Sequence, residues 1–195
     1  MKTQLIFLLL SLAGIISFSS CEKKNFDEMP PETRSGKNTF GCLIDGDLFV
    51  GGWGAPWMTA PLSTTYRSKS DHLSISVWGK RDNTFGGRIT IGVNTPRQNS
   101  TQKFSIVSYF PDSDEFNPSS VAANDTTTIY CPLFVSINDG ICTITKFDIH
   151  KKIVSGRFEF IGRCADWYYN IIDSTATTVQ ITQGRFDLKF DISND

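Results

Sequence analysis

Three closely spaced acidic residues, Asp112, Asp114 and Glu115, are the first candidates for chemistry in this chain. Two carboxyl groups at short range could act as general acid and base, or bind Ca²⁺. Their spacing is not that of a calcium-binding loop, which favours a solvated polar segment. His72 and His150 each stand beside a charged residue, and the chain has no Gly-x-Ser-x-Gly or His-Glu-x-x-His motif. We therefore predict a protein without a catalytic site, a metal site or a cofactor. A carboxylate-dependent hydrolase is an alternative.

Three tryptophans are the best candidates for ligand binding. Trp53 and Trp57 lie in a glycine- and proline-rich segment, residues 51–58, where regular structure is not expected. Trp78 lies in a stretch where apolar and polar residues alternate. Exposed aromatic rings on a β protein can stack on sugar rings, so a surface glycan-binding protein is one hypothesis. The favoured interpretation is that Trp53 and Trp57 fold back over an open end of the core.

Cys21 is the candidate for covalent modification. A basic residue, Lys2, precedes a short apolar run, residues 5–18, and small residues stand directly before Cys21. This pattern is typical of a secretory signal, and the run is shorter than the ~20 residues that cross a bilayer. The small pair followed by cysteine resembles a lipobox, although Phe18 stands where leucine is usual. We predict that residues 1–20 are removed and that Cys21 carries acyl chains such as palmitate. An ordinary cleaved signal is the alternative.

The other four cysteines are disulfide candidates, because an exported chain can keep disulfides. They are Cys42, Cys131, Cys142 and Cys164. Their long, irregular spacing does not indicate zinc, and buried free thiols are an equally weighted alternative. If Asp139-Gly140 is a two-residue hairpin loop, Cys131 and Cys142 are too far apart to bond. Cys42 or Cys164 is then the better partner for either.

The rest of the chain predicts one all-β domain, residues 38–195, behind a flexible lipidated tether, residues 21–37. The tether has few apolar residues and cannot offset the entropy of ordering it. Frequent Gly, Ser, Thr, Asn and Asp favour short strands joined by turns. Lys and Arg number 19 against 20 Asp and Glu, and no basic stripe suggests nucleic-acid binding. The predicted architecture is an antiparallel two-sheet β-sandwich, with a closed lipocalin-like β-barrel as the alternative.

Alternation of apolar and polar residues locates the strands. A hairpin is expected over residues 38–50, with its turn at Asp45-Gly46. Further strands are expected over residues 73–78, 88–95, 104–110, 127–137, 141–149 and 153–161, with residues 138–140 as a turn. In the last strand, residues 179–190, the apolar positions change from odd to even numbers, which predicts a β-bulge at Gly184. Arg185 and Asp187 are expected on its outward face, paired with Arg157 and Glu159.

Five stretches together resemble a family of uncharacterised Bacteroidetes-type lipoproteins. Besides the lipobox at Cys21, they are Asn38 to Gly46 (NTFGCLIDG), Ile144 to Asp148 (ITKFD), Ile153 to Phe160 (IVSGRFEF) and Ile181 to Asp187 (ITQGRFD). The resemblance implies an all-β, lipid-anchored envelope protein and implies no activity. Asp125-Thr126-Thr127 and Asp173-Ser174-Thr175 also resemble the O-glycosylation motif of the same bacterial group, with Thr126 and Ser174 as acceptors.

These features predict a lipid-anchored lipoprotein of the cell envelope, held at the outer membrane by the acyl chains on Cys21. The charges after Cys21 have both signs and give no clear export signal, so both the periplasmic and the cell-surface side of the outer membrane are retained as locations. We expect a non-catalytic binding or structural module, with a glycan or another envelope protein as its partner.

Overall fold

The computed structural model describes residues 25–53, 60–81, 84–103, 106–110, 134–135, 140–164 and 178–194. These residues form twelve β-strands in one sheet, and they contain no helix. The all-β prediction is confirmed. The strands are β1 (Thr39–Ile44), β2 (Asp47–Gly51), β3 (Leu62–Arg67), β4 (His72–Arg81), β5 (Thr84–Asn94), β6 (Ser100–Lys103), β7 (Ile106–Phe110), β8 (Phe134–Val135), β9 (Gly140–Asp148), β10 (Ile153–Cys164), β11 (Thr178–Lys189) and β12 (Asp191–Ser193).

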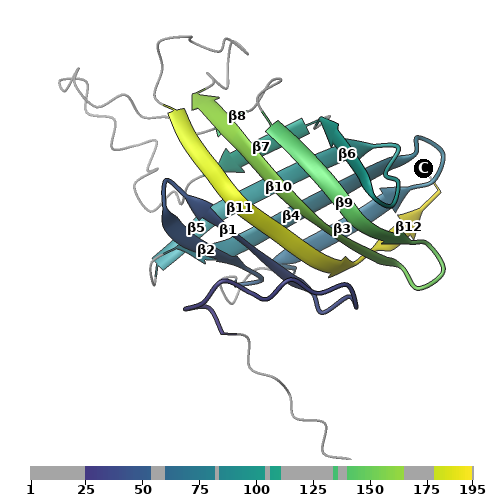
Figure 1. Ribbon diagram of the computed structural model, residues 1–195, viewed down its shortest axis with the longest axis horizontal. Helices are drawn as coiled ribbons and strands as arrows, with labels where there is room; N and C mark the ends of the chain where they lie inside the picture. Colours follow the sequence, from purple (N-terminus) through teal and green to yellow (C-terminus); the bar gives the residue numbers. More distant parts are fainter. Residues whose placement is uncertain are drawn as a thin grey trace, which may run out of the picture.

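The sheet is strongly curled (Figure 1). Its hydrogen-bonded order is β11-β1-β2-β4-β5-β7-β8-β10-β9-β6, and β11 also pairs with β10. Neighbours on this path are antiparallel, whereas β12 pairs with β3 in parallel at one end. The curl brings β11, which is late in the chain, beside β1, and β10 and β9 follow next to β11 in the sheet.

Alternate residues of the long strands fill the concave side of the sheet. The buried positions are even-numbered in β1 and odd-numbered in β4 and β5, and several are completely covered. Together with β10 and β11 they form one hydrophobic core. Full burial of one such side chain stabilises the fold by about 1.5–3 kcal/mol. The alternate apolar residues of each strand therefore determine which of its faces turns inward. The outer face of the sheet is left for polar side chains.

The first hairpin has the predicted turn. Ile44 pairs with Asp47, and the two residues between them, Asp45 and Gly46, have φ of 52° and 95°. Positive φ at both central residues matches the right-handed twist of the two strands, and Asp-Gly adopts it readily. The hairpin prediction is confirmed.

The predicted bulge is also present in β11. Against β1, the register changes between Gly41, opposite Arg185, and Leu43, opposite Thr182. Against β10 it changes between Phe158, opposite Gly184, and Phe160, opposite Ile181. The extra residue lets Ile181 and Phe186 both face the core. The positive φ falls on Gln183 and not on the glycine beside it.

The hairpin predicted around residues 138–140 is wrong, because the described strands on either side of it do not pair with each other. Val135 of β8 pairs with Arg163, and Gly140 of β9 pairs with Phe160, on the same edge of β10. Both strands are antiparallel to β10, so they run in the same direction and do not form a hairpin. The long β10 offers a continuous edge, and its hydrogen bonds determine the pairing. Cys142 lies opposite Phe158 and Gln102, so the hairpin register that separates Cys131 from Cys142 does not occur.

Candidate functional site

The chain just before β1 lies against the outside of the sheet. We call residues 29–37 the strap. Asp187 of β11 holds it and is only 1% exposed. Its carboxylate accepts five hydrogen bonds. Four come from the strap, with Thr33 Oγ1 (2.5 Å), Gly36 N (2.8 Å), Ser35 N (3.0 Å) and Lys37 N (3.1 Å) as donors, and one comes from Ser155 Oγ of β10 (2.7 Å). Asp187 therefore faces the strap and does not form the predicted surface pair with Arg157 or Glu159.

Two opposing effects act on the pKa of Asp187. Burial raises it, whereas the hydrogen bonds from Thr33, Ser155, Gly36 and Lys37 stabilise the charged form. The hydrogen bonds prevail and hold the pKa below its usual range. Asp187 is thus a buried carboxylate whose charge is balanced by donors, and those donors come largely from the strap.

Other contacts fix the strap along its length. Pro30 is buried over Gly41 of β1, where an added Cβ would come within 2.5 Å of the proline Cδ. Lys146 of β9 donates to the carbonyl oxygen of Arg34 at 2.9 Å. Residues 29–37, which the sequence assigns to a flexible tether, therefore lie packed against the sheet. Composition predicts mobility there, but a partner more than 100 residues away supplies the contacts that offset the ordering entropy.

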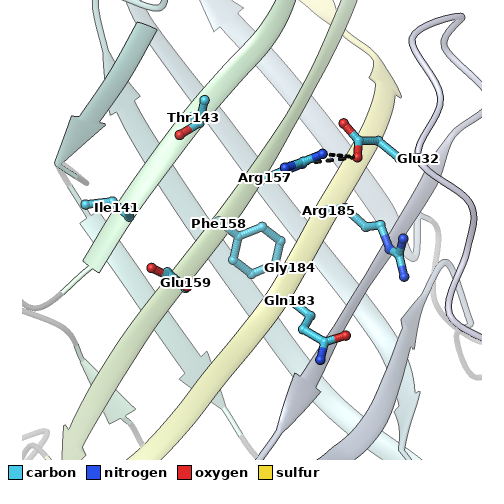
Figure 2. Close-up of a pocket in the computed structure, with 9 residues that line it drawn as sticks. All are labelled: Glu32, Ile141, Thr143, Arg157, Phe158, Glu159, Gln183, Gly184 and Arg185. Carbon is cyan, nitrogen blue, oxygen red and sulfur yellow. Dashed lines mark hydrogen bonds and ion pairs between the residues drawn. The ribbon is translucent and has the colours of Figure 1, made fainter.

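A pocket of about 400 Å³ lies where the strap meets the outer face of β9, β10 and β11. Its lining combines two cations, two carboxylates and a few neutral groups (Figure 2), from Glu32, Ile141, Thr143, Arg157, Phe158, Glu159, Gln183, Gly184 and Arg185. Gln183 and Gly184 belong to the bulge of β11, which therefore shapes one wall. The pocket is outside the hydrophobic core.

Arg157 is the cation at the centre of the lining. Its Nε and Nη2 both donate to Oε2 of Glu32, at 3.1 and 2.6 Å. The hydrogen bond from Arg157 is the main cause that lowers the pKa of Glu32, and it also raises the pKa of Arg157. Both groups are charged at neutral pH. The side chains are 65% and 28% exposed, for Arg157 and Glu32 respectively, so solvent screens the pair and it contributes little to stability.

Arg185 is the second cation, and it lies directly opposite Arg157 in the register of β10 and β11. Like charges in this position repel each other. In Figure 2 the side chain of Arg185 points away from that of Arg157. Its Nε is buried without a hydrogen-bond partner. Among the residues that the structure describes, no carboxylate forms an ion pair with Arg185.

The predicted tryptophan site is not part of this pocket. Trp78 lies opposite Arg88, whose guanidinium carbon is 5.2 Å from the centre of the indole ring. Gly52 N donates to the Trp78 carbonyl oxygen at 2.8 Å, which brings the segment that carries Trp53 beside β4. Trp57 is outside the described residues. The backbone next to Trp53 is therefore close to Trp78 in space, but neither tryptophan lines the pocket.

Two disulfide candidates are buried free thiols, Cys42 and Cys142. Neither therefore forms the disulfide for which it is a candidate. Burial raises the pKa of both thiols, that of Cys142 to about 12, so both are protonated and unreactive at neutral pH. Cys164 ends β10, but its side chain is not among those described, and Cys131 is outside the described residues.

Most of the remaining candidate residues lie outside the described part of the chain. Cys21, Asp112, Asp114, Glu115, Thr126 and Ser174 are outside it. Within it, no three His, Cys, Asp or Glu residues are grouped so as to hold a metal ion. Nor is any helix of those residues long and apolar enough to cross a membrane. His72 is half-buried, and burial, followed by the charge of Arg67, lowers its pKa.

The sequence places three of the lining residues on the outer face of the sheet but predicts no pocket there. Arg157, Glu159 and Arg185 were expected on the outer face, as paired surface charges. Glu32 was missed because it lies in a segment that reads as a tether. A search against protein-family models, curated proteins and solved structures finds no match for the chain, so the function has to be inferred from the geometry of this site.

Proposed function

We propose that the protein is a lipid-anchored lipoprotein of the cell envelope that acts as a non-catalytic binding module. The pocket between the strap and the outer face of β9–β11 carries this proposal, because it brings charged and polar groups together outside a filled core. Arg157 holds Glu32 ionised, so this carboxylate is a poor proton donor near neutral pH. That supports binding over acid–base catalysis.

We also propose a barrel-type fold in place of the two-sheet sandwich. One sheet contains all twelve strands, and β11 pairs with both β1 and β10. A sandwich has two sheets that pack face to face, whereas pairings that return to their starting strand are typical of a barrel. Apolar side chains occupy the interior, which directs a ligand to the outer face.

The strap sets how far the domain can stand from its anchor. The eight Cα–Cα steps from Cys21 to Met29 reach at most about 28 Å when the chain is fully extended. If acyl chains on Cys21 lie in the outer membrane, the domain is held near the bilayer surface. Two or three chains give stable attachment, at roughly 0.8 kcal/mol per buried methylene.

Replacing Cys21 with alanine is expected to remove the anchor and leave the folded domain intact. The protein should move from the membrane fraction to the soluble fraction, or accumulate unprocessed. Fractionation with blotting measures this, and mass spectrometry of the wild-type N-terminus checks for the acyl chains. A Ser20→Ala variant, which keeps a small residue before Cys21, is the matched control and should stay in the membrane. Membrane retention of the processed, unacylated Cys21→Ala protein would contradict the anchor.

Blocking the pocket is expected to abolish ligand binding. Thr143 lines the pocket on β9, so Thr143→Trp places an indole in it without changing the core. Wild-type protein and this variant would be tested against a panel of soluble polysaccharides and peptides on a biosensor surface. Gln180→Trp is the matched control, because Gln180 is exposed on β11 and does not line the pocket. If a panel member binds both variants equally, the pocket is not its site.

A further inference from the structure

The cation at the centre of the pocket is occupied by the protein's own carboxylate. Glu32 Oε2 receives both hydrogen bonds from Arg157, and no hydrogen bond to its Oε1 is recorded among the described residues. Two N–H groups of one guanidinium are the donors with which arginine recognises carboxylates. Because the Arg157 side chain is 65% exposed and solvent screens the pair, an external carboxylate can reach Arg157 and replace Glu32 at little cost.

A second cation lines this pocket and forms no ion pair with a carboxylate of the described residues. Arg185 lies opposite Arg157 and has a buried Nε with no partner. The charge of Arg185, like that of Arg157, helps to lower the pKa of Glu32, so this one carboxylate interacts with both cations. The strap side of the pocket therefore carries an excess of positive charge, which attracts an anionic group.

The rest of the lining has different chemistry. Glu159 supplies a carboxylate and Gln183 an amide. Thr143, which lies opposite Arg157 on β9, supplies a hydroxyl that shares a hydrogen bond of 2.9 Å with Thr101 Oγ1. Carboxylate oxygens accept hydrogen bonds, and amide and hydroxyl groups both donate and accept them. A ligand with many negative charges would be repelled by Glu159, whereas one carboxylate joined to a body rich in hydroxyl groups would match both sides.

We propose that the pocket binds an acidic sugar, whose carboxylate takes the place of Glu32 on Arg157 while its hydroxyl groups bond to Glu159, Gln183 and Thr143. Arg185 adds a second positive charge on the neighbouring strand. The strap is then an internal competitor for the ligand, because Glu32 occupies the position of the carboxylate. This inference rests on the proposed function and names the ligand class of the same pocket.

The experiment is calorimetric titration of the full-length lipidated protein in detergent with a short galacturonic-acid oligomer. The methyl-esterified oligomer, which lacks the charge, is the ligand control. We expect binding of the acidic oligomer only. Loss of one charged hydrogen-bonded contact in Arg157→Gln should weaken binding roughly tenfold or more. Glu32→Gln removes the competitor and should strengthen binding at least about threefold.

Variants separate this inference from a general effect of charge. Arg185→Gln should weaken binding, whereas Lys151→Gln, which removes an equal charge from an exposed turn, should not change it. Thermal unfolding of each variant checks that the fold is retained. Because Glu32→Gln is expected to gain affinity, misfolding cannot imitate its result.

Four outcomes would overturn the inference. If the esterified oligomer binds equally and Thr143→Trp abolishes that binding, the pocket stands as a binding site but the carboxylate is not recognised. If neither oligomer binds while another panel ligand is blocked by Thr143→Trp, the proposed function stands and the acidic-sugar inference fails. If a glutamate-rich peptide competes better than the oligomer, the ligand is an acidic peptide. If nothing on the panel binds, both the inference and the proposed function fail.

Discussion

Replacing Asp187 with alanine is expected to release the strap from the sheet and to destabilise the protein by roughly 3 kcal/mol. The wild-type carboxylate is 1% exposed and accepts five hydrogen bonds. Alanine removes every acceptor at once, so the strap donors are satisfied only if they undock and reach water. Ser155 stays in β10 and loses its partner in either case. Urea unfolding measures the stability, and amide hydrogen exchange at Gly36 and Lys37 measures undocking.

The same contact predicts a dependence on pH. The pKa of Asp187 is lower in the folded state than the ordinary value of about 3.9, so the unfolded chain binds the proton more tightly. The stabilisation is therefore complete above the ordinary pKa and is lost as the pH falls through the lowered one. Asp187→Asn should remove this acid sensitivity, because an amide does not titrate. The variant should also be less stable than the wild type, because the NH₂ of the amide would face hydrogen-bond donors.

Asp191 supplies the control for both measurements. It is an exposed carboxylate in β12 for which no hydrogen bond is recorded among the described residues, so Asp191→Ala should leave stability and strap exchange unchanged. If the Gly36 amide exchanged hydrogen no faster in Asp187→Ala than in the wild type, Asp187 would not be the residue that holds the strap.

Replacing Gly184 with alanine is expected to cost about 2–3 kcal/mol, the upper range for overpacking. A Cβ added there would lie 2.4 Å from the Phe158 carbonyl oxygen and 2.7 Å from two carbons of its ring. The ring is buried in the core and the oxygen belongs to the backbone of β10, so neither can move aside cheaply. Thermal and urea unfolding measure the loss, and near-ultraviolet circular dichroism reports the packing of the aromatic core.

The neighbouring bulge residue gives a matched comparison. Gln183 has φ of 53°, a conformation that glycine adopts without strain. Gln183→Gly relieves that strain but also raises the conformational entropy of the unfolded chain. Because the two effects oppose each other, the stability of the variant should stay within about 1 kcal/mol of wild type. The two adjacent substitutions should thus differ clearly. Equal, small effects at both positions would mean that β10 and β11 separate easily at the bulge.

The sequence alone determined the local structure of the strands. The Asp45-Gly46 turn and the bulge next to Gly184 were predicted from patterns a few residues long, and both are present. They could be predicted because burial repeats every two residues along a strand, and because few residue types accept positive φ. The inward faces of β4 and β5 follow from the same alternation.

Only the tertiary structure decided which strands pair and where the site lies. The 138–140 segment looked like a turn, yet β8 and β9 continue along one edge of β10, since the hydrogen bonds of a distant strand outweigh a weak local signal. By its position in the strand pattern Asp187 resembles a surface charge, and Glu32 resembles part of a tether, yet Asp187 is buried and Glu32 bonds to Arg157. Asp187 and Thr33 are 154 residues apart in sequence, so no local pattern could reveal that they bond. The pocket depends on that contact, because the same docked strap brings Glu32 to Arg157.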